Sequence, residues 1–262
     1  MTWLSIVARR RLSQVFLKDK RVVFRLVEQL PPPVQSKTVL EIGPGAGAVT
    51  RCLVDAGYDV VAVEVDEYWA RNLERQSHKI RIVQTSILDV SPAMLVHVPA
   101  VVVGSLPYHL SGAILRWLAD WADDVSTAVL ILQEEVVQRM AAKPGSRQRG
   151  LLGIVMQSVY DVRPLFRIHP RAFFPVPKVW SRAVDLKRPP QAKSVEEMRG
   201  VWEAARVLFR HRRKMIRGIL ERTYGREIRD RASQMGLDLT QRPENLTFAE
   251  LETLRFAVSG SR

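Results

Sequence analysis

The stretch Glu41-Ile-Gly-Pro-Gly-Ala-Gly47 follows a β-branched apolar run and precedes an amphipathic segment. This pattern predicts a buried strand, a tight glycine turn and a helix, because glycine lets the backbone turn and approach a ligand without a Cβ in the way. Glu64 lies 17 residues past Gly47, at the end of the next apolar run. A carboxylate placed there can accept hydrogen bonds from both hydroxyls of a ribose. Together the two features predict a nucleoside-type ligand beside a helix N-terminus.

Short apolar runs continue along the chain at intervals that leave room for a helix between them. They lie at residues 39–42, 60–64, 80–83, 100–103 and 128–132. Runs of this kind are typical of buried parallel strands, so we expect a doubly wound α/β sheet. Two later runs, 152–160 and 180–186, fit a closing antiparallel hairpin, although the first is equally compatible with a helix.

The strand pattern stops near residue 190, in the Pro-containing stretch that precedes Ser194. We therefore expect a sheet domain over 1–188, with a basic lid at its N-terminus, and a helical domain over 189–262. Ser194 with Glu197, and Thr247 with Glu250, have the spacing of capping boxes that open helices. The pattern predicts one long helix over 198–221 and a shorter one over 228–235.

The composition is that of a folded protein: 47% of the 262 residues are hydrophobic, while 40 Lys and Arg against 27 Asp and Glu give a net charge of +13. The apolar runs are far shorter than the roughly 20 residues of a membrane-spanning helix. Cys52 is the lone cysteine and the histidines are scattered, so we expect no disulfide, no metal site and a cytoplasmic location. The basic excess favours a polyanionic partner, although a generally basic surface is the alternative.

Two loops resemble those of known methyltransferases. The E-x-G-x-G-x-G turn, with Pro44 at its second variable position, resembles the S-adenosyl-L-methionine (SAM) loop of class I methyltransferases. The sequence Ser105-Leu106-Pro107-Tyr108 resembles the motif of enzymes that methylate exocyclic amino groups of bases. Such nitrogens are poor nucleophiles, so acceptors must hold their N–H bonds while the methyl arrives. Ser105 Oγ and the Leu106 carbonyl are the candidate acceptors; Pro107 fixes the backbone, and Tyr108 offers a stacking face.

Further blocks resemble, in order, those of the KsgA-type ribosomal RNA adenine N6-dimethyltransferases. They are residues 12–19, 133–136, 143–146, 173–181, 208–214 and 242–246. The resemblance implies a Rossmann-like class I methyltransferase sheet with a small C-terminal helical domain, using SAM. It also implies a monomer that methylates two neighbouring adenines in a hairpin near the 3′ end of small-subunit rRNA, or of a pre-30S-type particle.

The resemblance assigns roles to residues by matched position. SAM would be covered by Gln14, Val15 and Leu17, and its methionine part would be approached by Gly43 of the glycine turn, which also includes Gly45. Glu64 would hold the ribose, and Ser86 would contact the adenine amino group. Ser105 would hold the target N6 and border the cofactor. Phe173 would be a second stacking aromatic that faces Tyr108 across the base; the alternative is a core phenylalanine beside Pro175.

Three family positions are changed in this site. Val15 and Ser105 stand where the family usually has Asn, and Ser86 where it usually has Asp. Replacing a charge-assisted hydrogen bond of about 1.5–3 kcal/mol by a neutral one of about 0.5–1.5 kcal/mol can lower SAM affinity about tenfold. Asp89 could replace the acid only if the loop shifts its register.

These changes predict a weakened enzyme that stops at one methyl or one adenine. The competing hypothesis is an RNA-binding ribosome-assembly factor without catalysis. A third is a methyltransferase for a large-subunit adenine, of the antibiotic-resistance type, against which residues 143–146 and the Arg-rich stretch argue.

Basic residues gather in two stretches. Arg206, Arg210, Arg213 and Arg217 have a spacing that would align them on one helical face, with Lys214 beside them. We interpret them as RNA-phosphate ligands, with a solvated surface as the alternative. The second stretch lies within the first 25 residues and consists of Arg9, Arg10, Arg11, Lys18, Lys20, Arg21 and Arg25 against Asp19. Binding through either should weaken steeply with salt.

Overall fold

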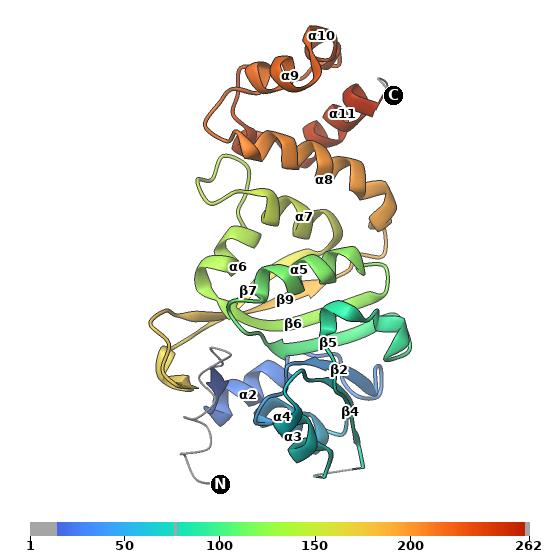
Figure 1. The fold of residues 1–262 in the computed structure, drawn as a ribbon, viewed down its shortest axis with the longest axis vertical. Helices are drawn as coiled ribbons and strands as arrows, with labels where there is room; N and C mark the ends of the chain where they lie inside the picture. The colour runs from blue at the N-terminus through green and yellow to red at the C-terminus, as the bar shows by residue number, and fades with distance from the viewer. Residues whose placement is uncertain (1–14, 76–77, 260–262) are drawn as a thin grey trace. The chain divides into compact units, whose positions relative to one another are not determined.

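The computed structural model describes residues 15–75 and 78–259, which form two compact units (Figure 1). The sheet unit comprises the described residues up to Val137 together with Arg163–Arg188, and the helical unit comprises Gln138–Val162 and the chain from Pro189 onward. The chain thus leaves the sheet unit for the last time after residue 188. Residues 138–162, however, which the sequence pattern assigns to the sheet domain, pack with the C-terminal helices.

The sheet unit is built on a seven-stranded sheet with the order β4-β3-β2-β5-β6-β9-β7, which Figure 1 shows from β7 down to β4. Its strands are β2 (Thr38–Ile42), β3 (Asp59–Val63), β4 (Ile80–Val83), β5 (Ala100–Ser105), β6 (Val125–Gln133), β7 (Asp161–Ile168) and β9 (Ser181–Lys187). The first five pair in parallel, and β9 pairs antiparallel with β6. The five predicted parallel strands are confirmed.

The expected closing hairpin is half right. The run 180–186 forms β9, but 152–160 is the helix α7 (Leu151–Val159), and the strand is the following segment, β7. A continuous apolar run of this length fits a buried helix as well as a strand. β7 is an edge strand of the sheet. Pro164 is tolerated there because only one side of an edge strand is hydrogen-bonded to a neighbouring strand, so proline's missing N–H need not cost a ladder hydrogen bond.

The helices of the sheet unit pack beside the strands. They are α2 (Lys20–Val27), α3 (Ala48–Asp55), α4 (Glu67–Glu74), α5 (Ser111–Asp120) and the start of α6 (Glu134–Met140). α3 packs against α2 and β3, and α4 against β4. Asp19 and Asp66 cap α2 and α4 by accepting backbone N–H groups of the first turn.

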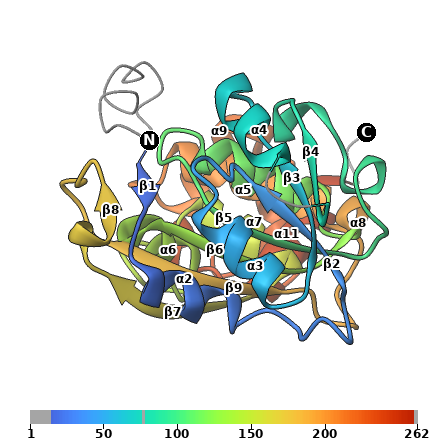
Figure 2. The same cartoon turned by 90° about the horizontal axis from the view of Figure 1, so that it is seen from below.

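Two short strands lie apart from the main sheet. β1 (Phe16–Leu17) pairs antiparallel with β8 (Phe173–Phe174), and Figure 2 shows them beside each other. The Lys18 N–H donates to the Ala172 carbonyl at 2.8 Å and extends this pairing. The N-terminal segment is thereby attached to the β7–β9 connection.

The strand order creates a crevice. From β2 the chain moves outward to β3 and β4, then returns to place β5 on the other side of β2. Ligands of open α/β sheets bind outside the carboxyl ends of strands at such a switch point. The loops after β2, β3, β4 and β5 all begin there, and they carry the residues singled out in the sequence.

The helical unit contains α7, α8 (Val195–Arg210), α9 (Ile216–Tyr224), α10 (Arg226–Gln234) and α11 (Phe248–Ser259). Both predicted capping boxes are confirmed: the Ser194 and Thr247 hydroxyls accept the Glu197 and Glu250 N–H groups, and each glutamate carboxylate accepts in return. Among the described residues, no helix is long and apolar enough to cross a membrane.

The single helix predicted over 198–221 is wrong, because the chain turns between α8 and α9. The N–H groups of Ile216 and Arg217 donate to the carbonyls of Gln241 and Leu239, at 3.0 and 2.9 Å. These tertiary partners replace the carbonyls of the preceding turn, which a continuous helix would have used. The stretch can therefore break without leaving these donors unpaired.

Candidate active site

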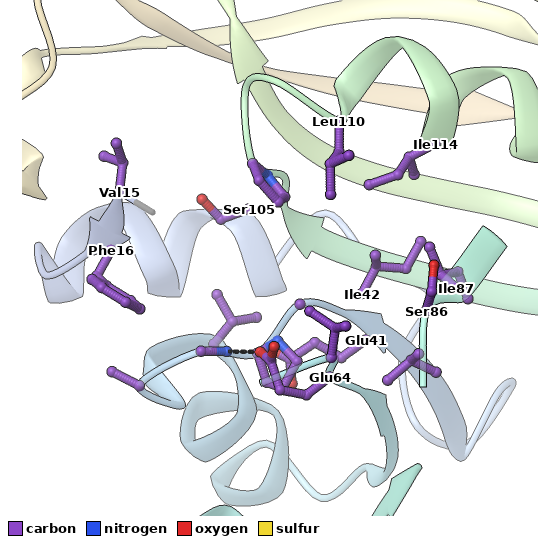
Figure 3. A pocket seen from close by; sticks show the side chains of 18 of the residues that line it. Val15, Phe16, Glu41, Ile42, Glu64, Ser86, Ile87, Ser105, Leu110 and Ile114 are labelled. Atoms are coloured by element: carbon purple, nitrogen blue, oxygen red, sulfur yellow. Dashed lines mark hydrogen bonds between the residues drawn. The ribbon is translucent and has the colours of Figure 1, made fainter. Parts of the chain in front are cut away.

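A cavity lies at the switch point, walled by β1 and by the loops that follow the four strands (Figure 3). Of the residues predicted from sequence, the following line it: Val15, Leu17, Gly43, Gly45, Glu64, Ser86, Ser105 and Pro107. Gln14 lies outside the described residues. The cavity thus gathers segments that are far apart in the sequence, as expected for a ligand site.

The glycine turn closes one side of this cavity. Gly45 has φ +50°, and a Cβ built on it would lie 3.0 Å from the ring of Phe16. Gly47 has φ +77° and begins α3, where a Cβ would lie 2.3 Å from a methyl of Leu73. Both positions therefore require glycine for backbone conformation and for space.

Glu64 is held rigidly at the end of β3. Its Oε2 accepts the Gly45 N–H at 3.0 Å, drawn as a dashed line in Figure 3, and its Oε1 accepts the Asp66 N–H at 2.9 Å. The side chain is almost fully buried, and burial raises its pKa. Each oxygen retains a further lone pair, so the carboxylate can still accept hydroxyl donors from a ligand.

Glu41 is a second buried carboxyl in the cavity wall, beside Glu64 in Figure 3. It is 1% exposed, and its Oε2 has no hydrogen-bond partner among the described residues. Burial, reinforced by the charge of Glu64, raises its pKa to about 7. Glu41 opens the glycine motif, but the motif alone assigns it no role; an acidic side chain inside a buried strand was the signal that could have singled it out.

Ser86 and Ser105 line other walls of the cavity. The Ser86 Oγ accepts the Leu88 N–H at 3.2 Å and caps the 3₁₀ turn Ile87–Asp89, so one of its lone pairs is already used. Asp89 does not line the cavity; it is the last residue of the turn that Ser86 caps. Ser105 is the last residue of β5.

The Leu106 and Tyr108 side chains do not line the cavity. Leu106 is buried, and its N–H donates to the Ile131 carbonyl at 3.1 Å, which fixes the peptide after β5. The Tyr108 hydroxyl shares a hydrogen bond of 2.7 Å with Ser181 Oγ on β9. Burial raises the Tyr108 pKa, so the phenol stays neutral at physiological pH.

Phe173 is not brought to the cavity. It is 1% exposed, pairs with Leu17 in the β1–β8 sheet and belongs to the hydrophobic core. In this structure it occupies the core position that was the alternative to a stacking role.

Several lining residues were not predicted from sequence. The aromatic one is Phe16, whose ring packs 5.2 Å from that of Trp69; the others include Thr85, His109, Leu110 and Ile114.

The basic residues of the helical unit form an exposed surface on its α8–α9 corner. Arg206 and Arg210 lie on α8, Arg213 and Lys214 in the turn, and Arg217 on α9, so the single helical face predicted for them is wrong. All five are exposed, and none makes an ion pair with another described residue. Arg212 is different, because it pairs with Glu244 and donates to the Arg147 carbonyl.

This architecture, with a ligand cavity at the switch point and a strand, β9, that pairs antiparallel with β6 in a sheet whose first five strands pair in parallel, is that of class I methyltransferases. Two solved structures share the fold: the 23S rRNA methyltransferase ErmE (TM-score 0.70, 24% identity, 93% of this chain and 99% of that chain) and a dimethyladenosine transferase from Plasmodium falciparum (TM-score 0.73, 19% identity, 91% and 95%).

Residues 6–255 match the family described as ribosomal RNA adenine dimethylase, and the chain belongs to that family. Among its relatives is Ribosomal RNA small subunit methyltransferase A of Leptothrix cholodnii, 34% identical over 96% of this chain and 92% of that protein. The protein of that name from Thermotoga maritima is 33% identical over 94% of this chain and 84% of its own length. The family assignment made from the sequence blocks is confirmed, and the protein is a SAM-dependent rRNA methyltransferase.

The charge and shape of the residues that line the cavity fit SAM. Two buried carboxyls, Glu41 and Glu64, suit a ligand that carries a positive sulfonium and ammonium, and one Glu41 oxygen lacks a partner among the described residues. Gly43 leaves space beside the turn, because a Cβ on it would meet nothing within 4 Å, and the apolar side chains of Val65 and Ile87 can flank an adenine ring.

Proposed function

We propose that the protein methylates the N6 atoms of adjacent adenines in the 3′-terminal hairpin of small-subunit rRNA during ribosome biogenesis. The observation that carries this is the meeting, at one cavity, of the glycine turn, Glu64 and the Ser105–Pro107 segment. The names of the relatives support the small subunit as the target. The substrate in this proposal is the rRNA or a pre-30S-type particle, the enzyme is a monomer, and the reaction takes place in the cytoplasm.

The catalytic proposal assigns hydrogen-bond acceptors to the target amino group. Ser105 Oγ and the Leu106 carbonyl accept its two N–H bonds and favour the pyramidal nitrogen of the transition state. When bound, SAM would supply the methyl group; the positive charge of its sulfonium passes to the amino nitrogen, which then loses a proton to solvent. Tyr108 stacks on the flipped adenine, with its hydroxyl already fixed by Ser181.

For the cofactor, we propose that Glu64 accepts the ribose hydroxyls and that Ser86 contacts the adenine amino group. Ser86 Oγ has one lone pair engaged by Leu88, so it holds an amino donor less strongly than the family's usual aspartate. Val15 and Leu17 of the β1 segment contribute an apolar wall, and Gln14 precedes them in sequence. These differences lower the affinity for SAM without removing the site.

The helical unit binds RNA in this proposal through Arg206, Arg210, Arg213, Lys214 and Arg217. Exposed cations without acidic partners are available for phosphates, and their displacement of counterions makes binding depend on salt. The sheet domain, assigned to 1–188 from sequence, carries the chemistry, and the helical domain over 189–262 carries this contact.

A second candidate is a ribosome-assembly factor that binds RNA without methylating it, which Val15, Ser86 and Ser105 favour. The decisive experiment incubates the protein with labelled SAM and, in separate reactions, unmodified small-subunit and large-subunit RNA, and counts methyls per RNA by mass spectrometry. Transfer to adjacent adenines supports the enzyme, with one methyl or two per base resolved directly. Retained RNA binding with no transfer at saturating SAM contradicts it and supports the assembly factor, while transfer only to large-subunit RNA supports the resistance-type enzyme.

A further inference from the structure

The segment that runs from β7 into β9 is rich in basic residues, three of which, Arg163, Arg167 and Arg182, pair with Asp185 or Glu134. Between residues 162 and 184 the chain has five basic side chains and no acidic one: Arg163, Arg167, Arg171, Lys178 and Arg182. All belong to the sheet unit, whereas the α8–α9 corner belongs to the helical unit. The proposed function does not use this segment, apart from Ser181.

Trp180 lies in this segment immediately before β9 and is 41% exposed. The Arg167 guanidinium carbon lies 4.4 Å from the centre of its ring, and the His169 ring meets it edge-to-face with a centroid distance of 4.9 Å. The indole thus has two defined neighbours and retains exposed area.

Hydrogen bonds hold this arrangement rigid. Glu134 Oε2 accepts from Arg167 Nη2 at 2.8 Å, which anchors the guanidinium beside the indole. The Glu134 N–H donates to the Trp180 carbonyl at 3.0 Å, which anchors the backbone. Trp180 is thus a preorganised surface, and little side-chain entropy remains to be lost when a ligand packs against it.

Trp180 is also connected to the proposed base-binding loop. The next residue, Ser181, is fully buried, and its Oγ shares the 2.7 Å hydrogen bond with the Tyr108 hydroxyl. One peptide unit therefore separates the exposed indole from the residue that fixes the proposed base-stacking tyrosine.

Cations without acidic partners flank the indole along this segment. Arg171 and Lys178 are exposed and make no ion pair with any residue the structure describes. The backbone bond from Lys18 to Ala172 joins this segment to the start of α2, whose exposed side chains include Lys20 and Arg21. Phosphate groups complement such a surface, and nucleobases complement the indole.

We propose that Trp180 is a stacking platform for an unpaired nucleotide of the RNA, flanking the target adenine. This rests on the proposed function in taking RNA as the ligand. Aromatic side chains beside cations bind single-stranded bases through stacking, whatever the base, while the cations contact the backbone. The charged side chains of this segment that make no ion pair with a described residue, Arg171 and Lys178, are both cations, which favours a phosphate-bearing partner.

The test measures binding of an rRNA hairpin that carries 2-aminopurine beside the target adenine. Trp180→Ala should weaken RNA binding by roughly 5- to 100-fold and abolish the quenching of 2-aminopurine fluorescence. Trp180→Phe should stay within about threefold of the native protein, because a phenyl ring still stacks. The matched control is Trp121→Ala: Trp121 is 39% exposed at the end of α5 and lacks these neighbours, so RNA binding should not change.

SAM affinity, measured by calorimetry, and the circular dichroism spectrum should be unchanged in all three variants. A folded Trp180→Ala protein that binds the hairpin as the native protein does overturns the proposal. The proposal is also overturned if Trp180→Ala loses binding to a protein-containing ribosomal particle but still binds the free hairpin normally. That result would assign the surface to a protein contact. RNA binding is measured without methyl transfer, so the proposed activity and the proposed role of Trp180 are tested separately. If the native protein never methylates RNA but needs Trp180 to bind it, the proposed activity is contradicted and the role of Trp180 stands.

Discussion

The Tyr108 hydroxyl and Ser181 Oγ lie 2.7 Å apart, joining the loop after β5 to the first residue of β9. This bond fixes the phenol end of a side chain whose ring is proposed to stack on the substrate base. The strand that closes the sheet therefore orients a residue of the reaction loop, although the two are 73 positions apart in sequence.

Ser181→Ala should lower kcat for RNA methylation about 5- to 10-fold and leave the Kd for SAM unchanged, because a lost hydrogen bond of about 1 kcal/mol loosens the Tyr108 ring. Tyr108→Phe should have a similar effect, since it removes the same bond. Steady-state kinetics with a hairpin RNA provide the measurement. Ser126→Ala, which removes a 3.1 Å bond to the Ala100 carbonyl at the other end of the sheet, is the control. Equal effects of the Ser126 and Ser181 variants would count against an orienting role.

Gly45→Ala should reduce SAM affinity at least about tenfold, because alanine at positive φ is strained by about 1–2 kcal/mol and its Cβ would press on Phe16. Calorimetric titration with SAM measures the loss. Gly112→Ala on helix α5 is the matched control. A Cβ at Gly112 would meet nothing within 4 Å, so alanine there should be neutral or stabilising. Native affinity in Gly45→Ala would remove the turn from the proposed cofactor contact.

Glu41 should make the stability of the ligand-free protein depend on pH. Burial raises its pKa from 4.5 to about 7, so the folded state binds a proton that the unfolded state releases between these values. Its contribution is therefore present below about pH 4.5 and declines as pH rises toward 7, by on the order of 3 kcal/mol. Urea unfolding at pH 5.5 and 8 should show the native protein losing stability relative to Glu41→Gln, which is neutral at both. Parallel profiles of the two proteins would refute this assignment.

Ser86→Asp should tighten SAM binding up to about tenfold, because a carboxylate forms a charge-assisted hydrogen bond to the adenine amino group and still caps the turn. Ser91→Asp, at the start of the 3₁₀ turn Pro92–Met94 and outside the cavity, controls for added charge. Calorimetry compares the two with the native protein. A Ser86→Asp affinity no better than that of the Ser91 variant would mean that this side chain does not meet the cofactor's adenine.

Arg210→Ala combined with Arg213→Ala should weaken RNA binding and reduce the slope of log Kd against log salt by about 2, because each arginine that neutralises a phosphate contributes about one unit. Fluorescence anisotropy between about 50 and 300 mM salt measures the slope. Arg199→Ala removes an exposed arginine from the same helix that is paired with Glu196, so it should change the slope little. An unchanged slope in the double variant would make the α8–α9 corner an ordinary solvated surface.

The parallel strands and the ligand loops could be predicted from sequence because both depend on local pattern. β-branched runs buried on two faces have few alternative structures, and the turn after β2 needs glycine for reasons of backbone geometry. The capping boxes at Ser194 and Thr247 are equally local, and both form.

The failures have non-local causes. Residues 198–221 divide into two helices because Gln241 and Leu239, later in the chain, accept the N–H groups of the second helix. Phe173 is a core residue because β1 pairs with its strand, which no periodicity reveals. The raised pKa of Glu41 could not be predicted because it results from burial and from the neighbouring Glu64, and both require the folded sheet.

The β1–β8 pair is a small sheet of its own, hydrogen-bonded between its two strands and separate from the seven-stranded sheet. One strand supplies Phe16 and Leu17 to the cofactor cavity, and the other, β8, lies within the β7–β9 connection that leads to Trp180. If RNA bound along this connection changes the affinity for SAM through the pair, SAM must change the affinity for RNA by the same factor, since linkage between two sites is reciprocal. Such coupling would pass through only four residues, Phe16–Leu17 and Phe173–Phe174.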